Sequence, residues 1–184
     1  MNRTRPDPAR EDRYADLYRR THPEVLRFVR RRSGADAAAA EDLVHEVFLT
    51  AWRRFDVVPA PHDEARAWLF TTARNHLLDH ARRQRRTALT IAIDDARLDV
   101  AAEHVDPGVA VDLVRAWQQL DPGQQEALAL ATWEGLSSQL AGRVLGISAA
   151  AYRIRLHRAR ARLRQLVHPA EAPRTTRTPE GKHA

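Results

Sequence analysis

The residues best suited to chemistry lie near the end of this 184-residue chain, in a run of cations that contains no acid. Residues 148–167 contain one histidine, His157, and the arginines Arg153, Arg155, Arg158, Arg160, Arg162 and Arg164. A solvated helix face normally mixes both signs of charge, whereas a surface of one sign attracts a polyanion such as the phosphate backbone of nucleic acid. The alternatives are an arginine-rich helix on the outside of a bundle and an amphipathic helix lying on an anionic membrane.

The sequence around this run predicts a helix-turn-helix, whose second helix is presented to DNA. Ser148 is a natural N-cap for the second helix, and Gly146 can take the positive φ that ends a short helix at 138–145. Ala141 and Gly142 carry almost no side chain, so the second helix can cross the first one closely. Its buried stripe recurs at steps of three and four residues: Tyr152, Leu156, Ala159, Leu163 and Leu166. Turn chemistry and charge therefore agree on DNA binding.

Histidines in the first half of the chain could indicate a metal site. His76 and His80 are four residues apart on a predicted helix, with Asp79 between them and His62 upstream. Two imidazoles at this spacing can share a metal ion, as in zinc enzymes with an HExxH motif. However, the glutamate of that motif is absent from HLLDH, and the arginines of the same segment would repel a cation. We therefore expect no metal site, no cofactor and no catalytic residue.

Composition narrows the class of protein further. The net charge of +6 and the pI near 10.8 favour an anionic partner. The absence of cysteine excludes disulfides, thiol catalysis and cysteine zinc sites. The charged, proline-bearing residues 1–13 resemble neither a signal peptide nor a membrane span, so we expect a cytoplasmic protein without membrane insertion.

Helical periodicity, without convincing strand alternation, predicts an all-α protein of two small helical domains joined by a flexible acidic linker. The N-terminal domain is expected at 11–86, after a disordered tail at 1–10. The linker is expected at 87–106. The C-terminal helix-turn-helix domain is expected at 107–168, before a disordered tail at 169–184.

The helices of these domains are predicted from their start and stop signals. The first is expected from about Glu11, interrupted or bent near Pro23, and its closing arginines are ordinary complements of the helix dipole. A second helix is expected at 37–56, followed by a loop at 57–64 and a third helix at 65–86. Two Asp-Pro pairs predict helix starts in the C-terminal domain: Asp106 with Pro107, and Asp121 with Pro122.

Two helices of the N-terminal domain carry groups whose role the pattern leaves open. On the helix at 37–56, several side chains project away from the main apolar face: Asp42, His45, Glu46, Leu49 and Trp52. They suit docking on another protein, but the apolar ones are equally consistent with the core. The helix at 65–86 mixes aromatic, amide and cationic groups: Trp68, Phe70, Arg74, Asn75 and Arg82. This mixture is typical of single-stranded nucleic-acid binding, although both aromatics could equally be core residues.

Three segments together resemble the extracytoplasmic-function (ECF) sigma factors, the small two-domain subunits for bacterial transcription initiation. They are AEDLVHEVFLTAW at 40–52, RAWLFTTARNHLLDHARRQRR at 66–86, and LDPGQQEALALATWEGLS followed by VLGISAAAYRIRLHRARARL. Their order and spacing match the family from about Tyr14 to Val167. The resemblance implies core RNA polymerase, through its β′ clamp and β flap, and promoter DNA as partners. It also implies an anti-sigma factor, and association with the nucleoid when polymerase is bound.

The resemblance also implies roles for individual residues. In the family, one helix of the sigma factor docks on the β′ clamp of the polymerase. Its contact residues correspond here to Asp42, His45, Glu46, Phe48 and Trp52, with His45 in place of the usual Gln. The family's residues that melt the −10 element and hold its flipped base correspond to Pro59, His62, Trp68, Arg74, Asn75 and Arg82. Contacts with the −35 duplex correspond to Ser148, Arg153, Arg155, His157 and Arg158. The sequence departs from the family at Ala150, Ala151 and Ile154, which puts in question the particular −35 sequence that is bound.

The nearest rival is a stand-alone helix-turn-helix repressor or activator with an N-terminal regulatory domain. Such a protein would need a dimer interface and would bind palindromic sites. The sequence offers no zipper or obvious dimerisation helix, and it carries a second basic, aromatic region that a repressor would not require. Dependence on RNA polymerase distinguishes the two hypotheses.

Overall fold

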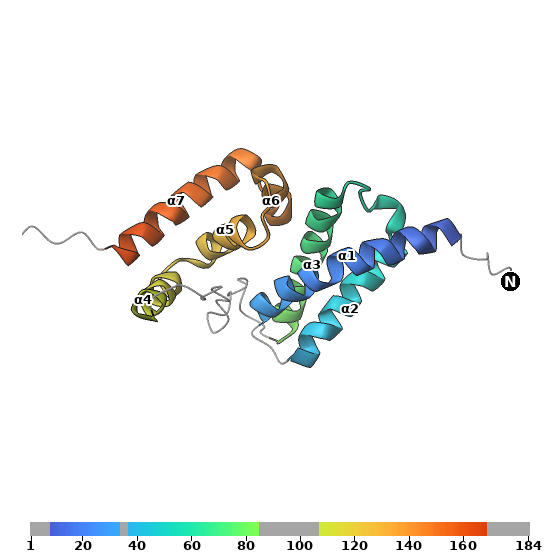
Figure 1. The fold of residues 1–184 in the computed structure, drawn as a ribbon, viewed down its shortest axis with the longest axis horizontal. Helices are drawn as coiled ribbons and strands as arrows, with labels where there is room; N and C mark the ends of the chain where they lie inside the picture. Colours follow the sequence, from blue (N-terminus) through green and yellow to red (C-terminus); the bar gives the residue numbers. More distant parts are fainter. Residues whose placement is uncertain (1–7, 34–36, 85–106, 169–184) are drawn as a thin grey trace, which may run out of the picture.

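The computed structural model describes residues 8–33, 37–84 and 107–168, and every regular element within them is helical. In chain order these are α1 (Pro8–Ser33), α2 (Ala37–Arg53), the 3-10 turn η1 (Phe55–Val57), α3 (His62–Gln84), α4 (Pro107–Gln118), α5 (Pro122–Thr132), α6 (Ser138–Leu145) and α7 (Ala149–Val167). The predicted all-α fold is confirmed (Figure 1). The predictions for the linker, for the C-terminal tail and for the Asp106 cap lie outside the described residues.

Helices α1, α2 and α3 pack against one another around a shared core. The rings of Phe28 and Phe70 stack at its centre, with centroids 4.7 Å apart. Fully buried aliphatic side chains complete it: Val25, Val29, Val44, Val47 and Leu69. This interior fixes which faces of α2 and α3 remain outside for a partner.

Helix α1 differs from the prediction in two places. It begins at Pro8, three residues before Glu11, where a proline lacks only an N–H that would be unpaired in the first turn. It also continues through Pro23, so the predicted interruption is wrong. Thr21 and Val25 are buried on either side of this exposed proline, and their packing holds the helix together against the local cost of the ring.

Helix α3 begins at His62, three residues before its predicted start. The predicted loop at 57–64 is therefore reduced to residues 58–61. Asp63 and Glu64 lie in the first turn of α3, where carboxylates are stabilised by the positive end of the helix dipole. The prolines marked the loop correctly, but the acids belong to the helix.

The predicted helix-turn-helix is confirmed at its caps and its turn. The Ser137 and Ser148 hydroxyls cap α6 and α7, and Gly146 ends α6 in the left-handed region at φ 69°. The predicted stripe of α7 is buried at Tyr152, Leu156 and Ala159 and only partly buried at Leu163 and Leu166. Tyr152, its first residue, donates its hydroxyl proton to the Ala127 carbonyl at 2.8 Å. Burial raises the pKa of Tyr152 to about 12, so the phenol stays neutral and keeps this bond.

Gly142 allows α6 and α7 to cross closely, as its small size predicted. A Cβ atom at this position would lie 2.8 Å from the Ile147 carbonyl oxygen and 3.3 Å from the Ala149 nitrogen. Both atoms belong to the backbone of the turn, so they cannot rotate away as a side chain would. The angle at which α7 is presented therefore depends on a residue without a side chain.

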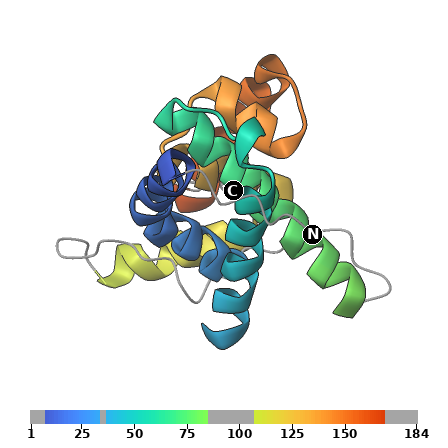
Figure 2. The ribbon, with the colours of Figure 1, turned by 90° about the vertical axis from the view of Figure 1, so that its right-hand side faces the viewer.

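The two domains are in contact. Helix α6 of the C-terminal domain lies against α3 of the N-terminal domain, as Figures 1 and 2 show from two sides. The sequence pattern predicted two domains and a linker but gave no sign of this contact. It brings the helix-turn-helix next to the helix on which most of the predicted −10 residues lie.

We expect Gly142→Ala to lower the free energy of unfolding by about 1–3 kcal/mol, because the added methyl group overpacks the crossing of α6 and α7. An exposed helical glycine would instead gain about 1 kcal/mol on the same change. Gln139→Ala, at an exposed position of α6, is the control and should stay within about 0.5 kcal/mol of the native chain. Urea unfolding followed by circular dichroism measures both, and a stabilised Gly142→Ala variant would contradict the close crossing.

Candidate nucleic-acid interface

The exposed face of α7 carries the predicted duplex-binding residues. Arg153, His157 and Arg158 are exposed, while Arg155 is half-buried beside the N-terminus of α5. Ser148 accepts the Ala151 N–H at 3.1 Å, so its hydroxyl is used to cap the helix. No acid lies on α7, and an uncompensated cationic helix at this place in a helix-turn-helix suits the phosphates and base edges of a major groove.

The predicted −10 residues of α3 differ in their exposure and in whether they are already paired within the chain. Asn75 and Arg82 are exposed, and Arg82 also pairs with Asp79 at 3.0 Å. Trp68 is half-buried and packs against the core, so it supports the surface from beneath. Arg74 is already paired, because its Nε lies 2.7 Å from Glu126 Oε1 of the C-terminal domain.

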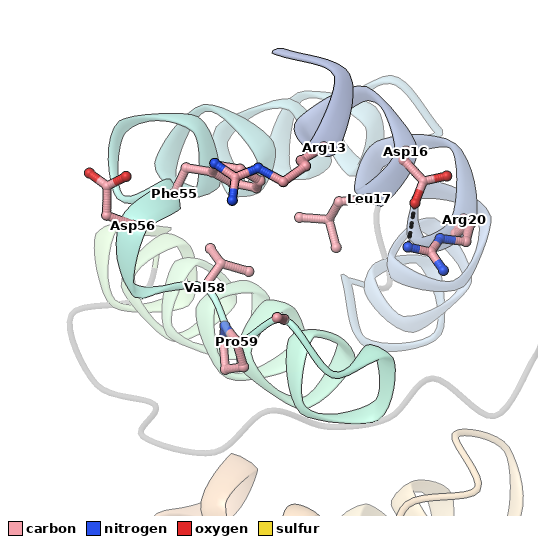
Figure 3. A pocket seen from close by; sticks show the side chains of 9 residues that line it. Arg13, Asp16, Leu17, Arg20, Phe55, Asp56, Val58 and Pro59 are labelled. Atoms are coloured by element: carbon pink, nitrogen blue, oxygen red, sulfur yellow. Dashed lines mark ion pairs between the residues drawn. The ribbon is translucent and has the colours of Figure 1, made fainter. Parts of the chain in front are cut away.

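A pocket of about 370 Å³ opens between α1 and the loop that precedes α3 (Figure 3). Leu17, Phe55, Val58 and Pro59 give it apolar walls. Its charged rim consists of Arg13, Asp16, Arg20 and Asp56, with Asp16 and Arg20 paired. Of the predicted −10 residues only Pro59 lines it, so the structure separates the loop pocket from Asn75. The contribution of α1 was missed, although its charged residues recur at steps of three and four.

A second hollow, of about 450 Å³, lies between α1 and α2. Its lining is mainly aromatic and apolar, from Tyr14, Tyr18, Phe48 and Leu49, with His45 at the side of α2. Asp42 lines an adjoining hollow that shares Tyr18, His45 and Phe48, and Glu46 is exposed on the same helix. An apolar groove with polar groups at its side has a composition that suits contact with another protein.

Two of the predicted clamp-docking residues belong largely to the fold. Phe48 is 3% exposed and forms the floor of the groove rather than a projecting contact. Trp52 lies under Tyr14, with ring centroids 4.9 Å apart, and under the Arg10 guanidinium at 4.9 Å. Periodicity could not distinguish these positions from projecting ones, because the covering groups come from α1.

The contact between the domains is built on a buried carboxylate. Glu134, 3% exposed, accepts from Arg31 at 2.9 and 3.1 Å and from Arg32 at 3.3 Å. The Arg32 guanidinium is fully buried and lies 3.6 Å from the centroid of the Phe28 ring. Burial lowers the pKa of Arg32 to about 10, against the opposing effect of Glu134, so this guanidinium stays ionised at neutral pH.

Further pairs extend this contact. Arg66 donates to the Glu134 backbone carbonyl at 2.9 Å and pairs with Glu24. Arg143 of α6 and Glu64 of α3 approach to 3.6 Å at the surface. Together with the bond from Arg74 to Glu126, these contacts give both buried glutamates of the C-terminal domain arginine partners in the N-terminal domain. The sequence contains one indication of this buried ion pair, since the acid Glu134 lies between the apolar Trp133 and Leu136.

Among the residues considered for a metal site, His76 and Asp79 have partners within the fold. His76 Nε2 lies 3.2 Å from the Thr50 hydroxyl. Across residues 8–33, 37–84 and 107–168, no three His, Cys, Asp or Glu side chains gather in a group that could hold a metal ion. In the same ranges, no helix combines the length and apolar character needed to cross a membrane.

The fold defines a class: a two-domain helical protein that pairs a helix-turn-helix domain with a domain of three packed helices. The family model for Sigma-70 region 2 matches residues 17–87, and that for Sigma-70, region 4 matches residues 110–163. The chain is 34% identical over 168 residues to RNA polymerase sigma factor CarQ of Myxococcus xanthus, covering 88% of this chain and 92% of CarQ. It is 33% identical over 140 residues to ECF RNA polymerase sigma factor SigL of Mycobacterium tuberculosis, covering 74% and 78%. The chain belongs to the ECF RNA polymerase sigma factors.

Two solved structures share the fold along most of the chain. The complex of sigma factor RpoE with the anti-sigma factor NepR from Bartonella quintana matches with a TM-score of 0.61 and 26% identity, covering 84% of this chain and 96% of that one. CnrH in complex with the cytosolic domain of CnrY matches with a TM-score of 0.56 and 25% identity, covering 85% and 88%.

We expect Glu134→Gln to lower the free energy of unfolding by about 3 kcal/mol, because it leaves the buried charge of Arg32 without its counter-ion. Glu41→Gln removes a carboxylate from an exposed pair with Arg30 and should cost no more than about 1 kcal/mol. Chemical denaturation at pH 7 gives both values. Equal, small losses in the two variants would show that the buried pair is not what holds the domains together.

Proposed function

We propose that this chain binds core RNA polymerase and directs it to promoters, with α7 on the −35 duplex and the N-terminal domain on the opened −10 strand. The observation that carries the proposal is the union, in one chain, of sigma regions 2 and 4 with an acid-free cationic helix in the second. The chemistry of RNA synthesis then belongs to the polymerase, and the chain supplies position and sequence choice.

On the −35 element, the N-terminal half of α7 enters the major groove. Arg153, His157 and Arg158 lie on its exposed face, where a guanidinium can contact guanine O6 and N7 or a phosphate. Base contacts of this kind contribute about 1–3 kcal/mol of discrimination each, whereas phosphate contacts contribute affinity alone.

On the −10 element, the pocket between α1 and the loop before α3 takes an unstacked base. Phe55 offers a ring for stacking, and Arg13 and Arg20 supply cations for the neighbouring phosphates. Asn75 and Arg82, exposed on α3 apart from this pocket, contact a neighbouring part of the strand. Extruding a base costs a few kcal/mol, which contacts in a preformed pocket can offset.

The groove between α1 and α2 is the proposed docking site for the polymerase β′ clamp. Tyr18 and Leu49 give it apolar surface, while Asp42, His45 and Glu46 supply polar contacts at its side. The β flap engages the C-terminal domain. Because the neighbours RpoE and CnrH were solved with NepR and CnrY, we extend the proposal to an anti-sigma protein for this chain. The complex with polymerase would reside in the cytoplasm, on the nucleoid.

The contact between the domains must change when promoter DNA binds. Arg74 is assigned to the −10 strand, yet in the closed arrangement Glu126 occupies its guanidinium. A phosphate can replace the carboxylate, since both are oxyanions with similar geometry for the guanidinium fork. Binding of the −10 strand therefore requires that α6 leave α3 and that Arg74 exchange the Glu126 carboxylate for a phosphate.

The proposal is tested by transcription in vitro with core bacterial RNA polymerase on a library of upstream sequences. We expect specific initiation only when both proteins are present, and the selected promoters should share a −35 and a −10 element. Tight binding of duplex DNA by a dimer of the chain alone, with no effect on polymerase, would support the repressor hypothesis instead.

Separate variants test the two DNA-binding domains. Asn75→Ala should reduce open-complex formation, measured by permanganate reactivity of the −10 strand, by about tenfold or more while −35 binding stays nearly unchanged. Arg153→Ala and Arg158→Ala should each weaken −35 binding by roughly tenfold, because each removes a base or phosphate contact. Loss of both activities in Asn75→Ala would refute its melting role, and unchanged binding in both arginine variants would remove them from the −35 contact surface.

A further inference from the structure

The centre of the exposed face of α7 is apolar. Ile154 is 54% exposed, although Tyr152 and Leu156 on either side of it are buried. Since successive residues of a helix are about 100° apart, Ile154 points away from the domain. Arg153 and His157 flank it on this face, and neither covers it.

The neighbours of Ile154 leave room for a ligand to approach. Ala150, one turn earlier, and Ala151 are both exposed and carry only a methyl group. Ile154 and Ala151 also form the apolar wall of a hollow of about 500 Å³. Its other side is polar, formed by Asp121, Gln124, Arg155 and Arg158. A branched aliphatic group that the fold leaves in water gains stability only when a partner covers it.

We propose that Ile154 recognises a thymine of the −35 element through the C5 methyl group of the base. In the major groove, thymine alone presents an apolar group, whereas the other bases present donors and acceptors. Isoleucine can form no hydrogen bond, so placing it against the cytosine amino group would desolvate that donor without a partner. The flanking arginines hold the phosphates and so fix the position of Ile154 over the base.

This inference rests on the proposed binding of α7 to the −35 duplex and adds a preference at one base pair. A protein could cover Ile154 instead, but every charged residue of α7 around it is cationic, and the one acid that lines the adjoining hollow, Asp121, is used to cap α5. That charge favours the phosphate backbone as the neighbour of the isoleucine. If Ile154 contacts a thymine, the −35 element contains an A·T pair under the N-terminal half of α7.

The test uses holoenzyme formed from the full chain and core polymerase, on the promoter selected by transcription. Each thymine of the −35 element is replaced in turn by deoxyuridine, which lacks only the methyl group. We expect one replacement to weaken binding about three- to tenfold, the effect of removing one buried methyl contact. Ile154→Ala should bind the thymine promoter about as weakly as the native chain binds the deoxyuridine promoter, with no further loss on the deoxyuridine one.

Arg158→Ala is the matched control on the same face. It should weaken binding to both promoters while preserving the ratio between thymine and deoxyuridine. If no thymine is sensitive to loss of its methyl, or if Ile154→Ala keeps the full sensitivity, the inference is overturned although promoter-specific initiation stands. If the holoenzyme initiates at no specific promoter, the proposed function fails and the inference fails with it.

Discussion

The arrangement described here depends on the carboxylate of Glu134. It is buried in the contact between the domains, and Arg31 and Arg32 donate to it from the end of α1. Taking a carboxylate and two guanidinium groups out of water is costly, and their attraction does little more than offset that cost. Such a cluster specifies one arrangement more than it stabilises it, because any other placement of α6 on α3 would leave a buried charge unpaired. The close crossing at Gly142 then transmits that placement to α7.

Arg74 has two possible anionic partners, the Glu126 carboxylate and a phosphate of promoter DNA. Arg74 of α3 is occupied by Glu126 in the closed arrangement, and it is also assigned to the −10 strand. Carboxylate and phosphate compete for one guanidinium, so closure between the domains and binding of promoter DNA exclude each other at this residue. With Arg74 assigned to DNA under the proposed function, the chain keeps part of its DNA-binding surface covered by Glu126. The proposal then requires polymerase and promoter to supply the free energy that separates the domains.

The sequence predicted the local structure well where one residue determines the conformation. Gly146 ends α6, and Ser148 and Asp121 cap their helices, because turn and cap chemistry is encoded in a few adjacent residues. Pro23 does not interrupt α1, one of the two outcomes expected of it, since the packing of α1 against the core outweighs the local preference of proline. Local signals are therefore reliable where no tertiary contact opposes them.

Contacts between distant segments were the part that the sequence could not provide. The arginines at the end of α1 look like dipole complements, yet two of them bind Glu134 about a hundred residues later. The loop pocket likewise includes Arg13 and Arg20 of α1, which are distant in sequence from the loop. Trp52 of α2 is covered by Tyr14 of α1. A periodic pattern shows that a side chain faces inward or outward on its own helix, but it does not show what another helix places above it.

The distance between the two domains provides the most direct test of the exchange of anions. The chain contains no cysteine, so cysteines introduced at Asp63 and Gln139, exposed positions of α3 and α6 near the pair of Glu64 and Arg143, can be labelled with a fluorophore pair without background. We expect high energy transfer in the free chain and a clear fall when core polymerase and promoter DNA form an initiating complex. Unchanged transfer in a complex that transcribes would contradict the exchange of anions, because Arg74 would then still be held by Glu126 of the C-terminal domain.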